Sequence, residues 1–205
     1  MEQYKFPGKK CKAVITDMNT PLGSNIGNAL EVKEAVETLQ GKVKGRFYDV
    51  CIELATDMLE IAGKGTNNEC RAMAEEAVSS GKALDVLRKT IRLQGGDERI
   101  CDDVSLLPRP EFHYEVRATE DMDIVSFNTE ELGMTSLLLG AGRTEKGDRI
   151  DPSAGIVMNC SPGDTLSEGD VIMTLYSSFC SDFSNAAVRA LNAVEFRSIG
   201  VRSYT

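Results

Sequence analysis

Hydrophobic side chains in the first half of the chain recur with the spacing of amphipathic helices. The period of about 3.6 residues appears in residues 32–39, 50–62, 68–80 and 83–93, and glycines stand where such helices end. The expected apolar faces are Val32, Val36 and Leu39 in the first helix and Val50, Leu54, Met58 and Ile61 in the second. Ahead of them, residues 13–15 form a short apolar run typical of a buried strand. The first hundred residues therefore predict one strand followed by four helices.

The hydrophobic period changes after residue 107. The stretch from Asp97 to Pro110 is polar, and its prolines discourage helix on both sides. Beyond it, residues 112–117 alternate apolar and polar side chains, which is the two-residue repeat of a half-buried strand. We therefore expect two domains, residues 1–107 and residues 108–205.

Short strands and two helices are expected in the second domain. Asn128 can cap a helix, because Glu131 stands three residues later, and Gly140 is placed to end it. Residues 150–177 predict a strand, tight turns and a second strand, and residues 183–194 predict a final helix.

Composition narrows the class of protein. The 205 residues are 41% hydrophobic and 27% charged, which is typical of a soluble globular chain. The net charge of −9 argues against a nucleic-acid partner, and no apolar stretch is long enough to predict a membrane span. The six cysteines form no CxxC pair, so we expect reduced thiols and a cytoplasmic location.

No catalytic constellation can be assembled from spacing alone. His113 is the only histidine, and it falls on the polar side of an alternating strand, which favours a structural residue facing solvent. Residues 140–143, Gly-Ala-Gly-Arg, close a predicted helix instead of opening one, so a helix end is a better interpretation than a nucleotide loop. We therefore predict no catalytic and no organic-cofactor-binding residue.

One long segment nevertheless resembles a known family. Residues 15–41, ITDMNTPLGSNIGNALEVKEAVETLQG, are similar to a signature segment of the thymidine and pyrimidine nucleoside phosphorylases. The similarity continues through residues 87–97, 132–157 and 161–178. Members of that family are homodimers in which phosphate, the co-substrate, attacks the sugar of uridine or thymidine and releases the free base.

The resemblance implies a fold and a limit on activity. It implies the C-terminal part of a large α/β domain, mostly helices, followed by an α+β hammerhead domain that is barrel-sandwich-like. In the family, the phosphate loop and the residues that hold the base precede the segment seen here. We therefore expect residues 1–205 to be inactive without a complementing N-terminal half, although the intact enzyme would bind a pyrimidine nucleoside and phosphate as a homodimer.

The resemblance also implies a monovalent cation site, usually taken as potassium. Matching the motif residue by residue assigns the backbone carbonyls of Leu22 and Asn25 and the carboxylate of Glu34 as ligands. Such oxygen ligands suit a hard cation. Asn25 stands where family members often have Ala, and the other ligands would be missing here, so weak binding is expected. The alternative is that Glu34 is a surface residue of the helix.

Two other functions stay open at this stage. The chain could be a non-catalytic remnant kept for assembly or regulation. Its turns at residues 163–164 and 168–170 also resemble those of biotinyl and lipoyl carrier modules, but the nearest lysine, Lys146, lies before the hairpin. We further expect the face of Val32, Val36 and Leu39 to lack its usual partners.

Overall fold

The computed structural model describes residues 8–199, and the outermost parts of the two predicted domains, residues 1–7 and 200–205, lie outside the described residues. The described chain forms two compact units. The helical unit comprises residues 8–17 and 35–106, and the sheet unit comprises residues 18–34 and 107–199.

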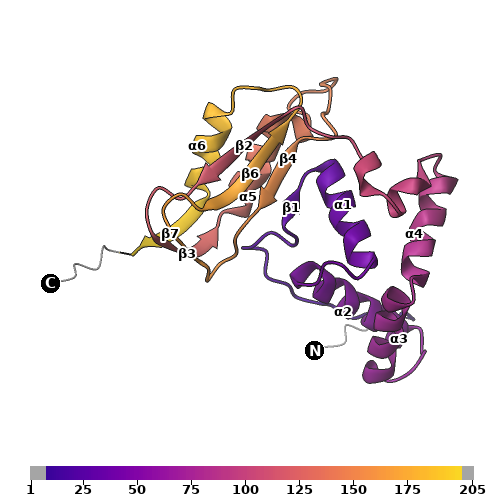
Figure 1. Cartoon of the computed structure of the whole chain (residues 1–205). Helices are drawn as coiled ribbons and strands as arrows, with labels where there is room; N and C mark the ends of the chain where they lie inside the picture. The colour runs from indigo at the N-terminus through magenta and orange to yellow at the C-terminus, as the bar shows by residue number, and fades with distance from the viewer. Residues whose placement is uncertain (1–7, 200–205) are drawn as a thin grey trace. The chain divides into compact units, whose positions relative to one another are not determined.

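The helical unit confirms the four predicted helices to within a few residues. They are α1 (Asn28–Leu39, which begins in the sheet unit), α2 (Arg46–Ile61), α3 (Asn67–Ser79) and α4 (Lys82–Leu93), followed by the 3-10 turns η1 (Glu98–Cys101) and η2 (Val104–Leu106) (Figure 1). Gly63 and Gly81 follow α2 and α3 with φ of 70° and 79°, as helix-ending glycines do. The buried side chains of this unit include Val36, Ile52, Cys70, Ala74 and Cys101.

Two details of the sequence prediction fail in this unit, and a third holds only in part. Residues 13–15 form no strand, and the side chain of Ile15 is 98% exposed. On α2, the expected buried residues Leu54 and Met58 are 41% and 68% exposed, whereas Ile52 and Thr56 are buried. On α1, the face expected to lack partners is covered only in part, since Val36 is 0% exposed whereas Val32 is 40% exposed. Side-chain period predicts an amphipathic helix, but the neighbouring elements decide which residues are covered.

The sheet unit contains two antiparallel sheets (Figure 1). One has the order β1-β4-β6-β2 and the other the order β5-β3-β7. The strands are β1 (Asn25–Ile26), β2 (Phe112–Arg117), β3 (Met122–Phe127), β4 (Gly155–Met158), β5 (Thr165–Leu166), β6 (Val171–Ser177) and β7 (Val194–Ser198), and the helices are α5 (Thr129–Ser136), the π-helical turn η3 (Leu137–Ala141) and α6 (Ser184–Asn192). This mixture of helices and antiparallel sheets is an α+β arrangement.

The register of the strands explains the core of the sheet unit. Val116 of β2 lies opposite Met173 of β6, and Met173 lies opposite Met158 of β4, so these apolar side chains share one face. All three are buried. The predicted cap of α5 is confirmed, since the Asn128 side chain accepts a hydrogen bond of 3.1 Å from the backbone N–H of Glu131.

Met18–Glu34 packs with the sheet unit, although the sequence placed these residues in the first domain. Its strand β1 pairs with β4, and the backbone N–H of Met158 donates to the carbonyl of Ser24 at 2.7 Å. The backbones of β1 and β4 approach so closely that a Cβ on Gly155 would lie 2.1 Å from the carbonyl oxygen of Ile26. Glycine at position 155 therefore permits this pairing.

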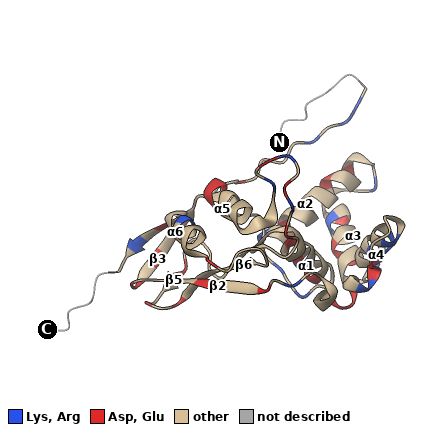
Figure 2. Cartoon of the chain, turned by 90° about the horizontal axis from the view of Figure 1, so that it is seen from above, with Lys and Arg blue, Asp and Glu red and all other residues tan. Residues whose placement is uncertain are grey.

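Charged side chains of both signs alternate on the helices of the helical unit. Figure 2 shows Lys and Arg interspersed with Asp and Glu along α3 and α4, and several of them form ion pairs, such as Arg92 with Glu98. Among residues 8–199, no helix is long and apolar enough to cross a membrane. The cysteines of the described chain are all free.

Candidate functional site: the loop held by Glu34

Glu34 holds together the loop that carries the other two candidate ligands. It lies in the second turn of α1, and its Oε1 accepts a hydrogen bond of 2.8 Å from the backbone N–H of Ser24. Its Oε2 accepts a second, of 3.2 Å, from the backbone N–H of Asn25. The residue is only 6% exposed, so the interpretation of Glu34 as a surface residue is wrong.

Gly23 makes room for this arrangement. A Cβ at position 23 would lie 2.3 Å from Oε2 and 2.7 Å from Cδ of Glu34. No real Cβ approaches an oxygen that closely, so the carboxylate occupies the space that any other side chain would fill. The sequence Leu22-Gly23-Ser24-Asn25 thus builds a loop around one carboxylate.

The residues present fit a monovalent cation in their donor chemistry. A carboxylate offers about four lone-pair positions, and the two backbone donors use only part of them. Among residues 8–199, Glu34 forms no ion pair with Lys or Arg. Because a buried carboxylate favours a compensating positive charge, a cation would suit this position. The described residues contain no cluster of three His, Cys, Asp or Glu suited to a metal ion, so a cation here would depend on backbone carbonyls such as those of Leu22 and Asn25.

A pocket of about 230 Å³ opens beside the start of α1 in the sheet unit. Its lining residues are Ile26, Gly27, Asn28, Glu31, Gly133, Ser136, Leu137, Ala141 and Gly142. Glu31 accepts a hydrogen bond of 3.0 Å from the backbone N–H of Gly27, and the Asn28 amide donates to the carbonyl of Ala141 at 2.8 Å. The second of these hydrogen bonds connects the first turn of α1 to the end of η3.

Sequence reasoning missed a second buried carboxylate, Asp151, which is 2% exposed. Its Oδ1 accepts from the backbone N–H and hydroxyl of Ser153 at 2.9 and 2.6 Å, and its Oδ2 accepts from the backbone N–H of Ser178 at 2.5 Å. Burial raises the pKa of Asp151, but these hydrogen bonds outweigh it and hold the pKa below its usual value. The Asp-Pro-Ser sequence is the signal, because Asp often accepts from the backbone two residues later.

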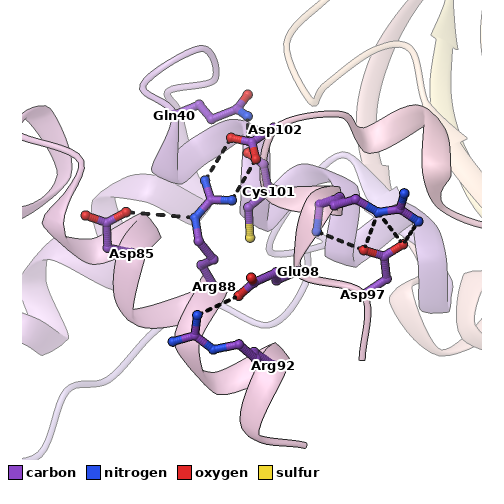
Figure 3. A network of polar contacts seen from close by, with 9 residues as sticks. Gln40, Asp85, Arg88, Arg92, Asp97, Glu98, Cys101 and Asp102 are labelled. Atoms are coloured by element: carbon purple, nitrogen blue, oxygen red, sulfur yellow. Dashed lines mark hydrogen bonds and ion pairs between the residues drawn. The ribbon is translucent and has the colours of Figure 1, made fainter. Parts of the chain in front are cut away.

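A polar network in the helical unit joins η1 to α4 and α1 (Figure 3). Arg88 makes a bidentate ion pair with Asp102 at 2.7 and 2.8 Å, and Gln40 donates to the carbonyl of Cys101 at 2.8 Å. Hydrogen bonds from Arg99 lower the pKa of Asp97 to about 2. Asp97, Glu98 and Asp102 each form an ion pair with an arginine. The network therefore stabilises the position of η1 and presents no reactive group.

The remaining candidates lie apart from these clusters. His113 is exposed on β2, with its ring centroid 6.2 Å from that of Tyr176, as expected for a structural residue. Gly140 has φ of 106° within η3, so residues 140–143 do close a helix. Lys146 is exposed in the connection between η3 and β4, outside the turns that flank β5.

Comparison with known proteins shows where this arrangement belongs. Residues 124–197 match the pyrimidine nucleoside phosphorylase C-terminal domain. Over 171 residues, or 83% of its length, the chain is 40% identical to a pyrimidine-nucleoside phosphorylase of Bacillus subtilis and 39% identical to one of Staphylococcus aureus. The chain belongs to the pyrimidine nucleoside phosphorylase family, and residues 124–197 correspond to the C-terminal domain of that family. It spans 40% of the length of these family members.

Proposed function

We propose that the chain supplies the C-terminal part of a pyrimidine nucleoside phosphorylase. In this proposal the complete enzyme catalyses reversible phosphorolysis of uridine or thymidine to the free base and a sugar 1-phosphate, and residues 1–205 have no activity alone. The observation that carries it is the 40% identity over 83% of the chain to an enzyme of that name. The described residues, in turn, show paired charges and buried carboxylates that serve structure, which supports inactivity of these residues by themselves.

The finer features of the family belong to the same proposal. The helical unit would be the remnant of the large α/β domain, and the sheet unit would be the hammerhead domain. The complete enzyme would bind a pyrimidine nucleoside and phosphate in the cytoplasm. It would do so as a homodimer or with a complementing N-terminal half.

The proposal includes a monovalent cation held by the carbonyls of Leu22 and Asn25 and the carboxylate of Glu34. Support comes from the burial of Glu34 and from its two hydrogen bonds to the backbone of that loop. A bound cation would supply a fixed positive charge beside the loop. We expect potassium chloride to raise the thermal midpoint of the chain above its value in choline chloride of equal ionic strength, and Glu34→Gln to remove most of the difference.

Activity is tested by phosphate-dependent release of uracil or thymine. We expect no release by the purified chain alone, and release when it is co-expressed with the part of the Bacillus subtilis relative that lies outside the match. Release by the chain alone would refute the claim of inactivity. A stable complex without release would instead favour the role in assembly or regulation.

A further inference from the structure

Strand β2 is an outer edge of the four-stranded sheet in the sheet unit. Among residues 8–199, β6 is the strand that pairs with it, so the far side of β2 presents backbone N–H and C=O groups without a strand neighbour in the described chain (Figure 1). The register with β6 shifts after Val116 because β6 carries the extra residue, Ile172, and β2 keeps an uninterrupted repeat. An edge of this kind is a template for another strand.

The side chains of β2 leave room for such a neighbour. The strand, with the sequence FHYEVR, contains neither proline nor lysine, two residues that commonly protect sheet edges. Phe112 and Tyr114 are exposed, and Tyr114 stacks on Phe183 at the start of α6, with ring centroids 6.0 Å apart. His113 and Glu115 are exposed on the opposite face of the strand. The edge thus offers aromatic side chains on one face and polar ones on the other.

The order of charges along this edge suits pairing with a second copy of itself. In an antiparallel pair of two β2 strands, residues at equal distances from the centre of the pairing lie opposite each other, on the same face of the sheet. With the centre at Tyr114, the opposed pairs are Tyr114 with Tyr114, Phe112 with Val116, His113 with Glu115, and Glu111 with Arg117. Aromatic and apolar residues then meet on one face. On the other face, each carboxylate meets a residue that can donate a hydrogen bond to it.

The neighbouring registers lack this match. A centre at Glu115 gives an overlap of the same length, but it places Glu115 opposite Glu115 and His113 opposite Arg117. A centre at His113 shortens the overlap and places Glu111 opposite Glu115. Like charges directly opposite each other destabilise a pair of strands, whereas opposite charges stabilise it. The sequence of β2 therefore favours the register centred on Tyr114.

We propose that β2 is a self-pairing edge, at which two copies of the chain join their four-stranded sheets about a two-fold axis at Tyr114. Such a contact uses the same surface on both copies, so the pairs His113–Glu115 and Glu111–Arg117 each occur twice. Glu115 already forms an ion pair with Arg117 of its own strand, which holds both side chains on the outer face. The contact does not rest on the proposed function, because it involves β2 alone and would form whether or not the chain takes part in phosphorolysis.

Sedimentation velocity of the purified 205-residue chain over a range of concentrations measures the self-association. His113→Glu places two carboxylates opposite each other, and Glu115→Lys removes the acceptor that faces His113. Because each change acts at two symmetry-related positions, each should weaken the association about tenfold. The control is Glu168→Lys, which makes the same change of net charge at an exposed turn before β6 and should alter the association less than about twofold.

A mixture of the two variants tests the register. When the His113→Glu chain meets the Glu115→Lys chain, the introduced glutamate lies opposite the introduced lysine, and the unchanged His113 lies opposite the unchanged Glu115. We therefore expect the mixture to associate at least as tightly as the wild type, although each variant associates poorly with itself. A variant that merely misfolds would not be rescued by the other.

Amide hydrogen exchange locates the contact. In residues 112–116, the amides that point away from β6 should exchange rapidly in the dilute chain and become protected as the chain associates. The amides bonded to β6 should be protected under both conditions.

Several results would overturn the self-pairing edge. One is a wild-type chain that stays monomeric at every concentration, and another is association that neither variant weakens. A mixture that associates no better than the separate variants would exclude the register centred on Tyr114. Protection of the outer amides that appears only when the part of the Bacillus subtilis relative outside the match is co-expressed would make another segment the occupant. None of these results bears on base release, so the proposed function stands or fails separately.

Discussion

Gly23→Ala should loosen the loop around Glu34, because the new methyl group needs the space that the carboxylate fills. The added Cβ would lie 2.3 Å from Oε2 of Glu34. Since this oxygen is the far end of a flexible side chain, we expect the carboxylate to swing away and the backbone to stay. The cost is then the loss of its hydrogen bonds to the backbone N–H groups of Ser24 and Asn25.

The size of the effect follows from those two contacts. A hydrogen bond to a charged acceptor contributes about 1.5–3 kcal/mol, and because this pair is only partly buried we take the lower value for each, roughly 3 kcal/mol together. Replacing glycine by alanine returns about 0.4–1 kcal/mol by restricting the unfolded chain, and the φ of Gly23 is not positive. Gly23→Ala should therefore lower the free energy of unfolding of the sheet unit by about 2 kcal/mol.

A double-mutant cycle isolates the cause. In a Glu34→Ala background, the methyl group has no carboxylate to displace, so Gly23→Ala should be neutral or stabilise by about 0.5 kcal/mol. Urea unfolding gives the free energies, and exchange of the Ser24 and Asn25 amides reports the loop itself, because a chain with two compact units need not unfold in one step. Glu37→Ala, on the same helix, is the control. Equal costs of Gly23→Ala in both backgrounds would refute the reasoning.

Two further predictions concern buried titratable groups of the sheet unit. The lowered pKa of Asp151 stabilises the fold fully above about pH 4, the pKa of an unfolded Asp, and this stabilisation is lost as pH falls through the folded pKa. Asp151→Asn should therefore lower the thermal midpoint at neutral pH and make the midpoint depend less on pH in the acid range. A variant whose midpoint falls with acid as steeply as that of the wild type would contradict this. Burial raises the pKa of the Cys160 thiol to about 11, so at about pH 8 iodoacetamide should label Cys160 far more slowly than the exposed Cys51, and mass spectrometry showing equal rates would count against it.

Local sequence patterns predicted most of the helices and strands. The alternation at residues 112–117 predicted β2 with its bounds, because an apolar–polar repeat of two matches the side-chain period of a strand. The expected covered face was only partly right, since Val116 is buried but Phe112 and Tyr114 are 40% and 48% exposed. The spacing of Asn128 and Glu131 gave the start of α5, because a cap is made between residues three apart. Both features depend on neighbours in sequence, so the sequence alone contains them.

Features that depend on distant residues were harder to predict. Residues 13–15 have the composition of a strand, but a strand also needs a partner edge, and the described residues provide none. Met18–Glu34 joined the sheet unit because β1 pairs with β4, more than a hundred residues later. In the candidate site, the family motif pointed to Glu34, but only the structure shows that Gly23 gives its carboxylate room.

The contacts of Glu34 also bear on how strongly a cation could act. The loop that carries Leu22 and Asn25 is already tied to Glu34 by two backbone hydrogen bonds, so ion binding need not supply the free energy to order it. Stabilisation by potassium would then follow mass action alone: a Kd of about 10 mM at about 0.1 M potassium corresponds to about 1.4 kcal/mol. Because the same carboxylate serves the loop and the ion, Glu34→Gln should weaken the fold in choline chloride as well, whereas a variant that loses only the potassium effect would separate the two roles.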